Sequence, residues 1–214
     1  DLFMTIQYDR KYDTCFLLLV DLAGSMEGKK KIDRVREFCY LISKTAFLLN
    51  IPVAIYGYRS KTNLDSDISE GIKKVTNRYY PLLIYRFKEF SDSFHAGSSN
   101  IEKIGPDICG GYTFIGESLE FAMDIVYNRN EQNKNIILLS DGSPEHPGKS
   151  DAVKNHFKEV VENINHSGVN LAGIDFSFAG YMGEYIDNSI KIDSIDTFIE
   201  QSYDQFYTIL KGDR

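Results

Sequence analysis

Two short, continuous apolar runs that each end on an aspartate restrict the possible folds more than any other feature of this 214-residue chain. Residues 16–20 lead directly to Asp21, and residues 135–140 lead to Asp141. Such runs are too short for ordinary helices, and they are typical of strands that are buried on both faces of a parallel sheet. Ligands of open α/β sheets bind outside the carboxyl ends of the strands. We therefore expect both aspartates to lie at a binding edge.

Strand-like and helix-like segments alternate along the chain, which predicts a doubly wound α/β fold with helices on both faces of a mostly parallel sheet. Apolar residues recur at helical spacing in the segments 35–49, 115–126, 153–164 and 195–210, and further strands are expected at 52–58, 82–87, 169–176 and 189–192. No convincing crossover helix precedes residues 82–87, so we expect this strand to run antiparallel at a sheet edge. Residues 59–80 are predicted to be a polar surface excursion, and residues 89–106 are expected to hold one short helix at most.

Neither linkers nor internal repeats interrupt this pattern, so residues 1–214 are predicted to form a single domain. Its core is expected to span about residues 14–211, after an N-terminal arm at 1–13. The chain begins without a methionine or a signal-like segment, which favours a fragment or processed form of a cytoplasmic protein over a secreted precursor.

Composition narrows the classes of partner. A formal charge of −7 disfavours nucleic acid, because binding to phosphates requires a basic face. No apolar run is long enough to span a membrane. Three widely spaced cysteines show no zinc-type pairing and are typical of small buried thiols in a reducing compartment. The four histidines are scattered through polar segments without a paired spacing, so neither zinc binding nor histidine-based catalysis is predicted.

The loop after the first strand allows more than one interpretation. Asp21, Ala23 and Ser25 follow each other at two-residue steps, and the aspartate and serine could simply cap the next helix. Their oxygens also suit magnesium, which prefers octahedral oxygen ligands and needs only one or two carboxylates. A third interpretation is a phosphate-binding loop, in which Lys29 would reach the nucleotide and Asp141 would hold magnesium. Lys30 stands where such a loop needs a serine or threonine.

The run Asp21-Leu-Ala-Gly-Ser-Met resembles the Asp-x-Ser-x-Ser run of von Willebrand factor A (VWA) domains, whose metal-ion-dependent adhesion site coordinates magnesium. The resemblance continues at Gly111-Tyr-Thr-Phe-Ile-Gly-Glu-Ser-Leu and at Leu139-Ser-Asp-Gly-Ser-Pro. It implies a metal site formed by Asp21, Ser25, Thr113 and Asp141. The hydroxyls would touch Mg²⁺ (or Mn²⁺ or Ca²⁺) directly, the aspartates would act partly through water, and the sixth position would receive an acidic group of a partner. Ala23 replaces a serine of the family motif, so we expect weakened metal binding.

Within this class, the chain is most similar to the C-terminal VWA domain of the aerobic cobalt chelatase T subunit, a family of cobalamin and porphyrin biosynthesis. That similarity implies a non-catalytic accessory subunit that works with an AAA+ ATPase and a large chelatase subunit. An enzyme is not expected from the residues themselves, because Gly24 lies at the wrong offset from Ser25 for a nucleophile elbow. Besides the phosphate-loop alternative, a secreted adhesion domain is a third possibility, which the unpaired cysteines disfavour.

Overall fold

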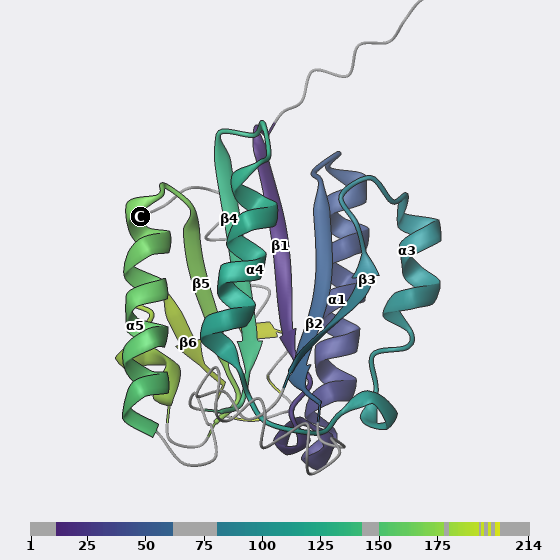
Figure 1. The fold of residues 1–214 in the computed structure, drawn as a ribbon. Helices are drawn as coiled ribbons and strands as arrows, with labels where there is room; N and C mark the ends of the chain where they lie inside the picture. The colour runs from purple at the N-terminus through teal and green to yellow at the C-terminus, as the bar shows by residue number, and fades with distance from the viewer. Residues whose placement is uncertain are drawn as a thin grey trace, which may run out of the picture.

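The computed structural model describes residues 12–61, 81–142, 150–177 and 180–192, together with residues 194, 197, 200 and 201. In this described part of the chain, six strands form one sheet in the order β3-β2-β1-β4-β5-β6, with helices on both faces (Figure 1). In chain order the elements are β1 (Thr14–Asp21), η1 (Gly24–Lys30), α1 (Lys31–Leu48), β2 (Val53–Ser60), β3 (Leu82–Lys88), α3 (Phe94–Ile101), η2 (Pro106–Ile108), α4 (Ile115–Tyr127), β4 (Asn133–Ser140), α5 (Ser150–His166), β5 (Asn170–Asp175), η3 (Tyr181–Glu184) and β6 (Ser189–Lys191).

The sheet is parallel except at one edge. β1 pairs in parallel with β2 and β4, β5 continues the sheet from β4, and β6 follows β5. Among the described strands, only β2 and β3 pair in the antiparallel direction, with a register shift at Ile55/Tyr56. The predicted doubly wound fold with an antiparallel edge strand is therefore confirmed. Because β1 and β4 are parallel neighbours, Asp21 and Asp141 follow strand ends that lie side by side (Figure 1).

Alternating side chains of β1 belong to two separate hydrophobic cores, because successive side chains of a strand point to opposite faces of a sheet. Phe16, Leu18 and Val20 pack with α1 on one face, whereas Leu17 and Leu19 pack with α4 and α5 on the other. All eight residues of β1 are buried, which explains why the segment lacks the polar alternation of a half-exposed strand. The central strand is consequently fixed from both sides.

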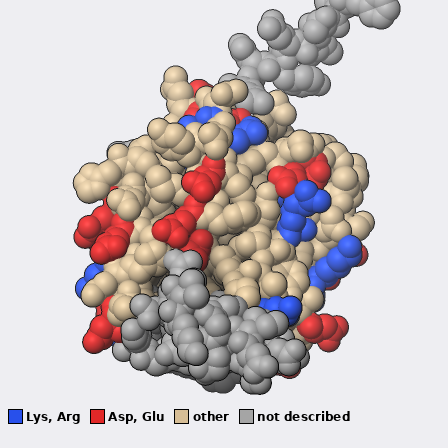
Figure 2. Space-filling view, viewed as in Figure 1, with Lys and Arg blue, Asp and Glu red and all other residues tan. Residues whose placement is uncertain are grey.

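Acidic side chains line the helix α4 on the face that α4 and α5 cover. Figure 2 shows acidic side chains along the middle of this face, over α4, which contributes Glu117, Glu120 and Asp124. Basic side chains are fewer and lie mainly toward the margins of the view. In the described part of the chain, no helix combines the length and the apolar character that a membrane crossing requires.

Some expectations concern residues that lie outside the described ranges. These are the N-terminal arm, nearly all of the polar excursion at 59–80, and most of the helix predicted at 195–210. Within the described ranges, the segment expected to hold at most one short helix contains α3, which packs against β3 and α1. Two short 3-10 turns, η2 and η3, were not expected from the sequence.

Candidate functional site

Asp21 ends β1 in a fully buried position. Its Oδ1 accepts a hydrogen bond of 2.8 Å from the backbone N–H of Ala23, and its Oδ2 accepts one of 2.5 Å from the Ser140 hydroxyl. Burial nevertheless raises the pKa of Asp21 to about 7, and the charge of Asp141 adds to this rise. Among the described residues, no cationic side chain pairs with Asp21. A buried carboxylate in this state favours a nearby cation, because buried charges need a counter-charge or a metal.

Ser25, Thr113 and Asp141 come from three different loops and meet beside Asp21. The Ser25 hydroxyl donates a 2.6 Å hydrogen bond to Asp141 Oδ1, and the Thr113 hydroxyl interacts with the Asp21 carboxylate. Thr113 also lies against the residue after Asp141, since a Cβ placed on Gly142 would stand 3.4 Å from Thr113 Oγ1. The structure therefore brings together all four residues predicted from the sequence. We call Asp21, Ser25, Thr113 and Asp141 the cation rim.

Backbone hydrogen bonds join the loops that carry the cation rim. Gly110 N donates to Leu22 O at 2.8 Å, and Gly24 N donates to Gly111 O at 3.3 Å. Gly111 has φ of +72°, a left-handed conformation that glycine adopts without steric cost. The position of Thr113 therefore depends on a turn that is tied directly to the loop after β1.

Two residues of the site were not predicted from the sequence. Ser140 belongs to the buried strand in the sequence pattern, yet its hydroxyl binds Asp21. Lys31 belongs to a run of three lysines with the pattern of an ordinary solvated helix start. Its ammonium nevertheless forms an ion pair with Asp141 Oδ2 and donates a 3.3 Å hydrogen bond to Ser25 O. No signal in the sequence separates Lys31 from Lys29 and Lys30.

The chemistry of the cation rim fits a hard divalent cation with one ligand fewer than the VWA motif provides. Within the described residues, no group of three or more His, Cys, Asp or Glu side chains could hold a metal ion. The hydroxyls of Ser25 and Thr113 beside the carboxylates form a set of oxygen donors that suits Mg²⁺ or Mn²⁺. Ala23 is 2% exposed and supplies only a methyl group at the position of the missing serine.

The same loop has little capacity to cradle a phosphate. Phosphate-binding loops need backbone N–H groups that point freely at the ligand. Here the N–H groups of Ala23, Gly24 and Met26 already donate to Asp21 Oδ1, Gly111 O and Ala23 O. The side chain of Lys29, on which the nucleotide alternative depends, lies outside the described atoms. The nucleotide-binding alternative stays a prediction that the geometry does not favour.

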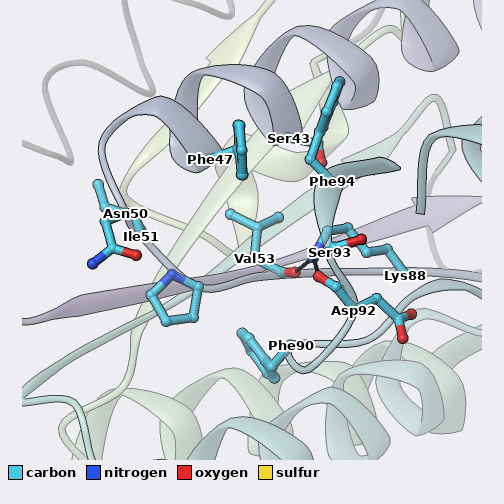
Figure 3. A pocket seen from close by; sticks show the side chains of 11 residues that line it. Ser43, Phe47, Asn50, Ile51, Val53, Lys88, Phe90, Asp92, Ser93 and Phe94 are labelled. Carbon is cyan, nitrogen blue, oxygen red and sulfur yellow. Dashed lines mark hydrogen bonds between the residues drawn. The ribbon is translucent and has the colours of Figure 1, made fainter. Parts of the chain in front are cut away.

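A second hollow lies at the opposite end of the sheet, where α1 ends and β2 begins. Its volume is about 220 Å³, and Figure 3 shows Phe47, Phe90 and Phe94 around it. The Lys88 ammonium donates to three backbone carbonyls, those of Val53, Glu89 and Asp92, at 2.9–3.0 Å. Because these bonds use all three ammonium hydrogens, Lys88 joins β2 and β3 to the following turn and offers nothing further to a ligand.

Solved structures with similar folds are VWA-type proteins at low identity. BatB from Bacteroides thetaiotaomicron is 11% identical, with a TM-score of 0.65 over 92% of this chain and 99% of that chain. Proximal thread matrix protein 1 from the mussel byssus, 12% identical, has a TM-score of 0.65 over 92% of this chain and 47% of its own. This chain thus spans about half of the mussel protein, which has also been solved with a zinc-occupied MIDAS motif. No curated protein matches the chain in sequence.

A protein-family comparison agrees with the observed fold. Residues 2–198 match the family described as "Cobalamin biosynthesis protein CobT VWA domain". This match includes every residue of the cation rim, together with Ala23 and Lys31. Because the match spans most of the chain, the protein belongs to the CobT VWA domain family.

Proposed function

We propose that this domain is a non-catalytic binding module that recognises a carboxylate of a protein partner through a divalent cation at the cation rim. The convergence of four oxygen-bearing side chains from three loops carries this proposal. Asp21 supports it in particular, because its buried carboxylate accepts hydrogen bonds from Ala23 N and the Ser140 hydroxyl but has no cationic partner among the described residues. A metal ion would supply the missing counter-charge.

Each member of the cation rim has a separate role in this proposal. Ser25 and Thr113 would bind the cation through their hydroxyls, and Asp21 and Asp141 would provide negative charge, partly through water. The bound Mg²⁺ or Mn²⁺ supplies a positive, oxygen-seeking centre with one position left for the acidic side chain of the partner. Ser140 holds the Asp21 carboxylate in place through its 2.5 Å hydrogen bond, an outer contact of the kind that fixes metal ligands.

Membership of a cobalamin biosynthesis family supports a specific setting for this module. We propose that it works in the cytoplasm with an AAA+ ATPase and a large subunit of a cobalt-chelatase-like complex. A non-catalytic role agrees with the environment of Ser25, whose hydroxyl donates to Asp141 rather than to a histidine that could act as a base.

Measuring the affinity for the AAA+ ATPase of the same organism, by biolayer interferometry with Mn²⁺ and with EDTA, tests this function. We expect EDTA and Asp141→Ala each to weaken binding by at least about 10-fold, as removal of a metal-site residue does. Asp124→Ala is the matched control, because it removes the same charge from an exposed position on α4. Binding that survives both EDTA and Asp141→Ala would contradict the cation bridge.

A further inference from the structure

Lys31 places a positive charge inside the cation rim. It is the first residue of α1, and its side chain is only 14% exposed. The ammonium pairs with Asp141 Oδ2 and also donates to the backbone carbonyl of Ser25 at 3.3 Å. Lys30, directly before it, has a left-handed backbone with φ of +60° and an exposed side chain. Of these two neighbouring lysines, therefore, only Lys31 contacts the site.

Both carboxylate oxygens of Asp141 are occupied in this arrangement. Oδ1 accepts from the Ser25 hydroxyl at 2.6 Å, and Oδ2 accepts from Lys31. The serine contact is compatible with a metal, because a hydroxyl that donates its hydrogen to a carboxylate keeps lone pairs for a cation. The lysine contact is not, because an ammonium and a divalent cation repel each other strongly at a few ångströms in a poorly solvated site.

The composition of the site explains why an ammonium is stable there. Ala23 contributes no oxygen to a metal, while the site holds the two buried carboxylates of Asp21 and Asp141. A single ammonium offsets part of this negative charge and requires neither an octahedral shell nor a full set of ligands. One of the residues that would hold a metal, Asp141, therefore already has a cationic partner from the same protein.

We propose that Lys31 is an internal competitor for the cation. Its ammonium neutralises Asp141 in the cation-free domain and must withdraw before a divalent cation binds. This inference rests on the proposed function, because it takes the cation rim to be the metal site. It adds a condition to that function: metal binding, and with it recognition of the partner carboxylate, requires release of the Lys31–Asp141 pair.

The size of the effect follows from the population of the paired state. When the binding-competent state is only fractionally populated, the apparent dissociation constant is the intrinsic constant divided by that fraction. A pair formed in about 90% of cation-free molecules would weaken metal binding about 10-fold, and one formed in about 99% would weaken it about 100-fold. Removing the ammonium should recover this factor.

Isothermal titration of Mn²⁺ into the wild type, Lys31→Met and Lys30→Met tests the inference, with circular dichroism to show that each variant is folded. Both substitutions remove one positive charge at neighbouring positions, so their general electrostatic effect is matched. We expect Lys31→Met to bind Mn²⁺ at least about 10-fold more tightly than Lys30→Met. Equal or weaker binding by Lys31→Met would overturn the competitor role while leaving the cation rim as a metal site. If no variant binds Mn²⁺, both the inference and the proposed function are wrong.

A second measurement uses the unmodified protein. Acylation of lysines by an amine-reactive ester, followed by mass spectrometry, reports how accessible each ammonium is. Lys31 should react more slowly than the exposed Lys44 on the same helix, and saturating Mn²⁺ should raise the rate at Lys31 at least about 10-fold without changing the rate at Lys44. An unchanged rate at Lys31 under saturating Mn²⁺ would show that the ammonium does not leave the site.

Discussion

Gly111→Ala should damage both the stability of the domain and its cation rim, because the glycine meets two separate constraints. Its φ of +72° is left-handed, which costs a residue with a Cβ about 1–2 kcal/mol. A Cβ at this position would also stand 2.5 Å from Ser60 Oγ and closer still to the Ser60 carbonyl oxygen. Overpacking of this kind typically costs about 1–3 kcal/mol. Together the two terms predict a loss of about 2–5 kcal/mol in the free energy of unfolding.

The clash falls on atoms that position the Thr113 loop. Ser60 Oγ accepts a 2.7 Å hydrogen bond from Tyr112 N, and Ser60 N donates to Tyr112 O at 3.1 Å. Moving Ser60 away from a new methyl group would lengthen these bonds and shift Thr113 relative to Asp21. We therefore expect folded Gly111→Ala to bind Mn²⁺ more weakly than the wild type, as measured by calorimetry.

Urea unfolding followed by far-ultraviolet circular dichroism measures the stability term, since the chain has no tryptophan. Gly168→Ala is the matched control, because Gly168 has a similar φ of +79° but has no atom within 4 Å of an added Cβ. It should lose only the backbone term of about 1–2 kcal/mol. If Gly111→Ala is no more destabilising than Gly168→Ala, the contact with Ser60 does not constrain the loop and the reasoning fails.

Three further predictions concern the rim, the sheet and the thiols. Ala23→Ser should tighten Mn²⁺ binding by about 10-fold or more by restoring an oxygen ligand, and equal calorimetric heats for both proteins would remove Ala23 from the explanation. Asn135→Ala should lower the free energy of unfolding by about 2–4 kcal/mol, because the buried amide donates hydrogen bonds to Thr14 Oγ1 and Cys15 O. Urea melts measure this loss, and a loss below about 0.5 kcal/mol would contradict the importance of these bonds. Burial raises the pKa of the Cys109 thiol to about 12, so its reactive thiolate form is scarce in the folded protein at pH 8. Iodoacetamide should therefore alkylate Cys109 about 1,000-fold more slowly in the native than in the unfolded chain. Comparable alkylation rates would show that burial does not protect this thiol.

The positions where the apolar runs end, and the order of the motifs along the chain, were enough to predict much of the fold and the members of the cation rim. Short continuous apolar runs are typical of central parallel strands, and Asp21 and Asp141 each come at the end of such a run. Parallel neighbours necessarily bring their carboxyl ends to one edge, so the meeting of these residues follows from topology. Thr113 could be placed there because its glycine turn precedes the helix between the two strands.

Other features depend on contacts that sequence patterns do not record. The helix α3 contains Gly97 and two serines, which are poor helix formers, and it is held by the Ser93 cap and by packing against α1 and β3. Lys31 is indistinguishable from its lysine neighbours in the sequence, because the left-handed backbone of Lys30 and the proximity of Asp141 appear only in three dimensions. A partly buried ion pair between residues 110 positions apart leaves no local signal in the sequence.

The two sides of the cation rim differ in how firmly they are held. β1 is enclosed along its full length, so Asp21 is a rigid reference point that neither helix layer can shift alone. Ser25 and Gly24, by contrast, are exposed and belong to the turn between β1 and α1 rather than to the sheet. We therefore expect the turn, rather than β1, to adjust when an ion binds. The signal of a spectroscopic label beside Ser25 should change when a metal ion occupies the site, whereas the signal of a label near the start of β1 should not change.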